Sequence, residues 1–133
     1  MTQLLIADSD NDSREKVAAM LTQAGYNVLV SNSVANVLDD TLKRRAEVII
    51  LGQDCDNMGV AELVHLLKQC NRNIPIILLS GDQPLPVMRK VRSEGIFYHA
   101  RKSFDPEARQ ELLEAVKCAF KNLLRAQHPC SSY

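Results

Sequence analysis

The sequence has neither an excess of charge of one sign nor a long apolar run. Its 133 residues include 16 basic and 16 acidic side chains, so the formal net charge is zero. A balanced charge provides no electrostatic attraction for non-specific binding to nucleic acid. The longest aliphatic runs are about four or five residues, whereas a membrane-spanning helix needs about 20. The composition therefore predicts no nucleic-acid partner and no membrane association.

The sequence also has few cysteines, and none of them is close to another. The four are Cys55, Cys70, Cys118 and Cys130. Structural zinc sites require cysteine or histidine ligands at short spacings, which this pattern does not provide. The N-terminus is neither basic nor followed by the apolar stretch of a signal peptide. We therefore expect a soluble, cytoplasmic protein with free thiols.

Signatures of common enzymes are missing as well. The sequence has no glycine-rich phosphate-binding loop and no dinucleotide-binding fingerprint. It offers no convincing Ser-His-Asp or Cys-His set, because Ser80 and His99 fall at the ends of different predicted strands. We therefore expect that the chain is not an enzyme, and we rank an enzymatic or small-ligand function below the functions considered next.

What the sequence does contain is a regular alternation of short apolar strands and amphipathic helices. The predicted strands are residues 4–7, 27–31, 48–51, 75–80 and 97–100. Helices are predicted from Asp12 or Ser13 to Ala24, from Ser33 onward, over residues 61–70, from Pro84 to Glu94, and from Asp105 to Arg125. Gly25 and Gly95 are placed to end two of these helices. This pattern predicts one domain over residues 1–125 and a tail over residues 126–133.

The apolar character of the strands predicts an α/β fold. Near-continuous apolar strands indicate a parallel sheet that is covered by helices on both faces. The flavodoxin-like (βα)5 arrangement, a three-layer sandwich with strand order 2-1-3-4-5, is the natural choice. Sites in such sheets lie at the carboxyl ends of the strands. At that edge the sequence places Asp8, Ser9, Asp10, Gly52, Gln53, Asp54, Ser80, Gly81 and Lys102.

Three local patterns at this edge occur in an order that resembles a known family. Asp8-Ser9 follows the first strand, Ser80-Gly81 follows the fourth, and Lys102 follows the fifth, two residues before Phe104. Over roughly residues 3–124 the chain resembles the receiver domain of response regulators in two-component signalling. The resemblance implies that Ser80 and Lys102 are the residues that contact a phosphoryl group, and that His99 stands at the aromatic switch position.

The same resemblance points to losses in the phosphorylation pocket. Receiver domains bind Mg²⁺ through an acidic pair after the first strand, and here only Asp8 remains because Ser9 replaces the second acid. The aspartate that accepts the phosphoryl group would fall on Gly52, which has no side chain to act as a nucleophile. We therefore expect a degenerate pseudo-receiver that has no cofactor and that binds Mg²⁺ weakly at best through Asp8. In such a pocket Lys102 is expected to pair with Asp8, or with Asp54 or Asp56 of the following loop.

In an alternative interpretation the domain is still phosphorylated, but on a different aspartate. Asp54 lies two residues after Gly52, and a shift of two residues preserves the direction of a side chain on a strand. Asp54 would then be a relocated acceptor. That shift would place Gly52 and Gln53 inside the strand and would break the family spacing to Met58.

Under the first interpretation the chain is a phosphorylation-independent signalling module that works by protein–protein contact. The resemblance implies a contact surface formed by residues 84–94, 97–100 and 106–125. The consecutive Phe97, Tyr98 and His99 favour such a surface because aromatic residues are enriched at interfaces; alternatively, alternate members of this trio fill the core. The expected partner is a protein, for example a histidine kinase or an output protein, or a second copy that docks through the last helices. His99 is either a pH-sensitive switch or a half-exposed strand residue.

Overall fold

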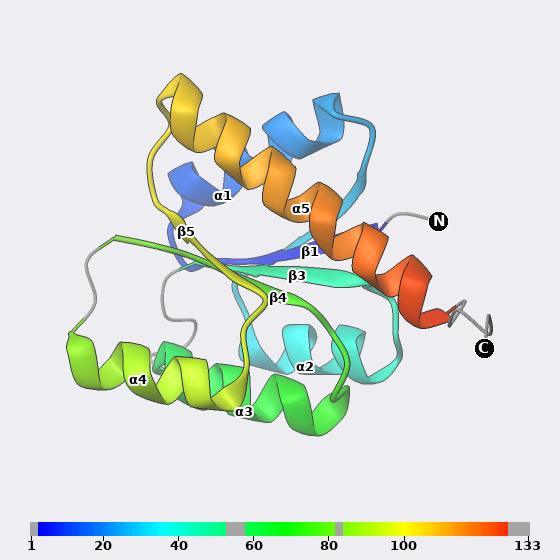
Figure 1. Ribbon diagram of the computed structural model, residues 1–133, viewed down its shortest axis with the longest axis vertical. Coiled ribbons are helices and arrows are strands. Elements are labelled where there is room, and N and C mark those ends of the chain that lie inside the picture. Colours follow the sequence, from blue (N-terminus) through cyan, green and yellow to red (C-terminus); the bar gives the residue numbers. More distant parts are fainter. Residues whose placement is uncertain (1–2, 53–57, 82–83, 128–133) are drawn as a thin grey trace.

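The computed structural model describes residues 3–52, 58–81 and 84–127. Its centre is a five-stranded parallel sheet with the order β2-β1-β3-β4-β5. Helices α1 and α5 cover one face of the sheet, and α2, α3 and α4 cover the other (Figure 1). The predicted flavodoxin-like fold is therefore confirmed. Among the described helices, none combines the length and the apolar character needed to cross a membrane.

Strands and helices alternate along the whole described chain. The strands are β1 (Gln3–Ala7), β2 (Asn27–Ser31), β3 (Val48–Leu51), β4 (Ile76–Ser80) and β5 (Tyr98–Arg101). The helices are α1 (Asn11–Gln23), α2 (Val34–Leu42), α3 (Val60–Cys70), α4 (Leu85–Glu94) and α5 (Pro106–Gln127).

Burial on both faces explains the continuous apolar runs of the central strands. Every residue of β3 and of β4 is buried. One core cluster lies between the sheet and helices α2, α3 and α4, and the second lies between the sheet and helices α1 and α5. Strands that are covered on both sides cannot alternate apolar with polar residues, because each side chain faces a helix layer.

The start of α1 differs from the sequence expectation. Asp10, and not Asp12 or Ser13, caps the helix, since its carboxylate accepts hydrogen bonds from the backbone N–H groups of Asp12 and Ser13. A capping side chain must precede the amides that it satisfies by two or three residues, and Asp12 and Ser13 already belong to the first turn. Ser33 caps α2 as predicted, by accepting from the N–H of Asn36.

Several further boundaries differ by one or two residues. β5 begins at Tyr98, one residue later than predicted, although the N–H of Phe97 still donates to the carbonyl of Ile76. α3 begins at Val60, directly after the extended Gly59. α5 continues to Gln127, so residues 126 and 127 belong to the helix and not to a tail. Alanine and glutamine favour helical structure, which explains the longer helix.

Candidate functional site

The carboxyl ends of four neighbouring strands bring the predicted site residues to one edge of the sheet. Asp8 follows β1, Gly52 follows β3, Ser80 ends β4 and Lys102 follows β5. The N–H of Gly52 donates to the carbonyl of Ala7 at 2.8 Å, and the N–H of Lys102 donates to the carbonyl of Ser80 at 3.0 Å. These two bonds extend the sheet pairing by one residue, and they hold the backbone of the site in a fixed position. Ser9 is exposed.

The side chain of Asp8 occupies the space beside Gly52. A Cβ atom built on Gly52 would lie 2.2 Å from Asp8 Oδ2, 2.3 Å from its Cγ and 2.9 Å from its Cβ. Non-bonded carbon and oxygen atoms do not approach this closely, since the optimal separation of carbon atoms is about 3.5–4.0 Å. Asp8 is only 1% exposed. Any side chain at position 52 therefore requires Asp8 to move.

Backbone contacts hold Asp8 in this position. Its Oδ1 accepts a hydrogen bond from the N–H of Asp10 at 2.9 Å. Its backbone carbonyl accepts a hydrogen bond from the guanidinium of Arg14 at 2.7 Å. Because Asp10 also caps α1, the start of that helix and the orientation of the Asp8 carboxylate are coupled.

Lys102 lies between two carboxylates. Its Nζ is 3.9 Å from Asp8 Oδ2 and 3.5 Å from Asp10 Oδ2, and its side chain is 15% exposed. The expected pairing with Asp8 is present, and Asp10 is a second partner that the sequence analysis did not propose for it. The backbone N–H of Ser13 is the largest cause that lowers the pKa of Asp10, and the Lys102 ammonium adds to the lowering. The other expected partners, Asp54 and Asp56, lie outside the described residues.

The donor set of the described residues does not fit a magnesium ion. One oxygen of Asp8 accepts from a backbone N–H, and the other faces the Lys102 ammonium. Ser9 brings no charge, and Gly52 has no side chain to act as a ligand. Mg²⁺ requires near-octahedral oxygen ligation, usually with one or two carboxylates. Within the described ranges, no group of three or more His, Cys, Asp or Glu side chains could hold a metal ion.

Ser80 and His99 are in direct contact, which the sequence analysis did not anticipate. Ser80 Oγ lies 2.9 Å from His99 Nε2, because β4 and β5 are neighbouring parallel strands. The predicted strand order was the signal that could have indicated this contact. Burial is the main cause that lowers the pKa of His99, with a further lowering from Arg92 and an opposing effect of Glu111. Burial and Arg92 therefore both favour the neutral form of the imidazole.

The three consecutive residues before Ala100 have different environments. Phe97 is half-buried and packs against the core beneath α1 and α5. Tyr98 is 37% exposed, and its hydroxyl donates to Glu111 Oε2 of α5 at 3.0 Å. This hydrogen bond is the main cause that raises the pKa of Tyr98. His99 is half-buried and turns toward Ser80.

A doubly wound parallel sheet with acidic, hydroxyl and lysine side chains at its carboxyl edge is the architecture of receiver domains. The sequence profile of the response regulator receiver domain matches residues 4–117. The chain therefore belongs to the response regulator receiver family.

Comparisons with individual proteins agree with this assignment. The chain is 28% identical over 118 residues to the response regulator protein TodT of Pseudomonas putida, a match that covers 89% of this chain and 51% of that protein. It is 26% identical over 97 residues to the sensor kinase/phosphatase CqsS of Vibrio cholerae, over 71% of this chain and 14% of that protein. The chain thus spans about half the length of the first curated relatives that it matches.

Solved structures share the fold. A response regulator receiver domain protein from Clostridium thermocellum superimposes with a TM-score of 0.80 at 21% identity, over 93% of this chain and 99% of that one. The chemotaxis response regulator CheY4 of Vibrio cholerae superimposes with a TM-score of 0.75 at 24% identity, over 87% of this chain and 98% of that one.

Proposed function

We propose that this receiver domain is a cytoplasmic, non-enzymatic signalling module that acts through protein–protein contact, without phosphorylation at the end of β3. The observation that carries the proposal is the position of the Asp8 carboxyl group in the space of a side chain at position 52. An aspartyl phosphate needs a carboxylate nucleophile, and Gly52 has none.

The charges around the pocket support the same function. Lys102 is held near two carboxylates of its own chain, at 3.9 Å and 3.5 Å. A largely buried ammonium requires opposite charge, and Asp8 and Asp10 supply it without a phosphoryl group. Signalling in this arrangement depends on which partner the surface binds.

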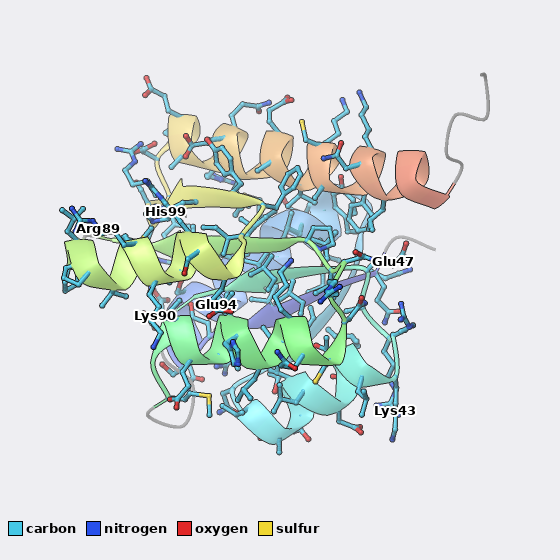
Figure 2. All side chains as sticks on the ribbon, turned by 60° about the horizontal axis from the view of Figure 1, so that its bottom comes forward. Lys43, Glu47, Arg89, Lys90, Glu94 and His99 are labelled. Atoms are coloured by element: carbon cyan, nitrogen blue, oxygen red, sulfur yellow. The ribbon has the colours of Figure 1, made fainter. Side chains whose placement is uncertain are left out.

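The proposed contact surface consists of α4, β5 and α5. Leu85, at the start of α4, is 64% exposed, and Tyr98 adds an exposed aromatic ring. α4 carries three exposed basic side chains that have no ion-pair partner among the described residues: Arg89, Lys90 and Arg92. α5 carries exposed side chains of both signs, the acidic Glu107, Glu111 and Glu114 and the basic Arg109, Lys117 and Lys121. Figure 2 shows Arg89 and Lys90 on α4 and His99 on the adjacent β5.

This distribution of charge favours a protein partner with complementary charges. A second copy of the chain fits, because a two-fold arrangement can bring the basic side chains of α4 in one copy against the glutamates of α5 in the other. A histidine kinase or an output protein can use the same surface, since complementary charge steers association between proteins.

The decisive experiment is phosphorylation by a small phosphodonor. We expect that incubation with acetyl phosphate and Mg²⁺ leaves the intact mass unchanged, and that beryllofluoride with Mg²⁺ does not shift the amide resonances of Asp8, Gly52, Ser80 and Lys102. A stoichiometric phosphoryl adduct would refute the proposal. An adduct that is lost in Asp54→Asn and retained in Asp56→Asn would establish the alternative, in which Asp54 is a relocated acceptor.

A further inference from the structure

We propose that the domain has a second binding site, at the amino end of the sheet, for a small amphipathic anion. The site is a hollow of about 440 Å³ whose apolar walls come from the loop before β4, the loop before β5, and α5. These walls are formed mainly by Ile74, Pro75, Ile96, Phe97 and Leu123. A second hollow of about 380 Å³, lined by Lys68, Gln69, Arg72 and Glu94, shares Lys68 with the first.

The location separates this site from the pocket around Asp8. β4 begins at Ile76 beside the hollow and ends at Ser80 beside Lys102, so the two sites lie at opposite ends of the same strand. In Figure 1 the C-terminal end of α5 and the starts of β3 and β4 lie on one side of the molecule, and the start of α1 lies on the other. The inference is therefore independent of whether the domain is phosphorylated.

Lys68 provides a cation that is held at the junction of the two hollows. Its Nζ donates to the carbonyl of Ile74 at 2.9 Å and to the carbonyl of Arg72 at 3.5 Å. No carboxylate of the described residues lies within ion-pair distance of it. Burial lowers the pKa of Lys68, which indicates that the ammonium is partly removed from water without a compensating anion. A bound anion would supply that missing charge.

Arg72 provides a second cation. It is exposed, and its guanidinium makes no hydrogen bond or ion pair with any residue that the structure describes. A guanidinium presents a planar set of donors that matches carboxylate and phosphate groups, so Arg72 can form a two-point contact with an anion. Arg72 lines the second hollow, and Lys68 lines both, so the two cations lie beside the apolar walls of the first hollow.

One acidic side chain, Glu94, lines the second hollow, and it already has a partner. Glu94 Oε1 lies 2.9 Å from His65 Nδ1 of α3. Figure 2 shows Glu94 on α4, near α3. Among the described residues, no ion pair joins Glu94 to Lys68 or to Arg72, so its one paired oxygen faces the imidazole of His65.

The shape and chemistry of the site define the class of ligand. Hollows of about 300–1,000 Å³ accommodate small molecules, and this hollow lies at the lower end of that range. The apolar walls favour a compact hydrocarbon body, and the two cations favour a carboxylate or phosphate head. Inorganic phosphate alone would contact the cations but would leave the apolar walls in water, so we expect an amphipathic anion to bind more tightly.

A titration followed by amide NMR tests the inference, with hexanoate as the probe. We expect saturable shifts at Asn73, Ile96 and Leu123, and none at Asp8, Gly52 and Lys102. Lys68→Met and Arg72→Gln should each weaken hexanoate binding about tenfold, the effect of losing one charge-assisted hydrogen bond. Lys43→Met, an exposed lysine of the α2 end that does not line the hollow, is the matched control and should leave binding unchanged.

Two further probes test whether the ligand needs both its charged head and its apolar body. One further variant tests the site without removing a cation. 1-Hexanol should bind much more weakly than hexanoate, and inorganic phosphate should also bind more weakly. Asn122→Asp adds a negative charge to the exposed wall of the hollow and should abolish hexanoate binding, even if Lys68→Met fails to fold. Equal binding of 1-hexanol or of phosphate, or the absence of saturable shifts in the unmodified protein, would overturn the inference.

Discussion

The carboxyl group of Asp8 fills the space into which a side chain at position 52 would project. Its Oδ2 lies 2.2 Å from the Cβ position of residue 52, and the N–H of Asp10 holds its other oxygen at 2.9 Å. Glycine at position 52 and the inward orientation of Asp8 are therefore mutually dependent. This relationship places Asp8 near Lys102, and it makes the stability of the pocket sensitive to both residues.

Gly52→Ala should destabilise the domain. The added methyl group overlaps the Asp8 carboxyl group, and overpacking of this kind costs about 1–3 kcal/mol of unfolding free energy. Urea denaturation measures the loss. Gly81→Ala is the control, since a Cβ at Gly81 would have nothing within 4 Å.

The cause of the Gly52→Ala effect can be isolated with a double-mutant cycle. In an Asp8→Ala background the two closest atoms, Oδ2 and Cγ, are absent, so most of the cost of Gly52→Ala should disappear. An equal cost in both backgrounds would show that the contact with Asp8 is not the source.

Asp8→Asn should also destabilise the domain, by about 1–3 kcal/mol, because it removes a charge that faces the largely buried Lys102 ammonium. The comparison is Asp12→Asn, which breaks an exposed pair with Lys16 at 3.1 Å and should cost at most about 1 kcal/mol. Denaturant unfolding at neutral pH gives both values. If Asp8→Asn leaves stability unchanged, the pairing with Lys102 is unimportant.

The imidazole of His99 should titrate below its usual pKa of 6.5. Burial disfavours the charged ring, and Arg92 opposes protonation further. Because the folded pKa is lowered, the contribution of His99 to stability is full above pH 6.5 and decreases as the pH falls toward the folded pKa. NMR titration of the ring Cε1 proton measures the pKa directly.

Two substitutions should move the pKa of His99 in opposite directions. Arg92→Gln removes a nearby positive charge and should raise it, while Glu111→Gln removes a negative charge and should lower it. A folded pKa at or above the usual value in the unmodified protein would contradict the neutral imidazole beside Ser80.

If the surface of α4, β5 and α5 mediates self-association, reversal of the basic charges on α4 should weaken it. Arg89→Glu combined with Arg92→Glu places like charges opposite the glutamates of α5 in a partner copy, which should shift sedimentation velocity profiles toward the monomer. Lys16→Glu on α1 is the control and should have no effect. A chain that sediments as a monomer at all concentrations would leave a different protein as the partner.

The regular parts of the fold could be predicted from the sequence because each strand and helix has its own periodic pattern. The apolar strands β3 and β4, the glycine at the end of α4 and the serine before α2 were all placed within a residue or two. The cap of α1 was misplaced because three residues near its start, Asp10, Asp12 and Ser13, are all good caps. Only the direction of the chain before the helix decides which side chain reaches the free amides.

The candidate site was predicted less completely than the fold. The sequence placed Asp8, Gly52, Ser80 and Lys102 at one edge because the carboxyl ends of parallel strands meet there. It did not indicate that Asp8 fills the space beside Gly52, that Asp10 pairs with Lys102, or that Ser80 contacts His99. These contacts depend on rotamers and on distances between neighbouring strands, which no spacing along the chain encodes.

The sequence by itself determined the layered α/β architecture, the order of its elements and the absence of a side chain at position 52. These properties follow from local patterns and from the chemistry of single residues. Only the tertiary structure decided that Asp8 would take the space beside Gly52 and that Lys68 would border an apolar hollow at the opposite end of β4. Both arrangements join residues that are far apart in the chain, and close packing of the core brings them together.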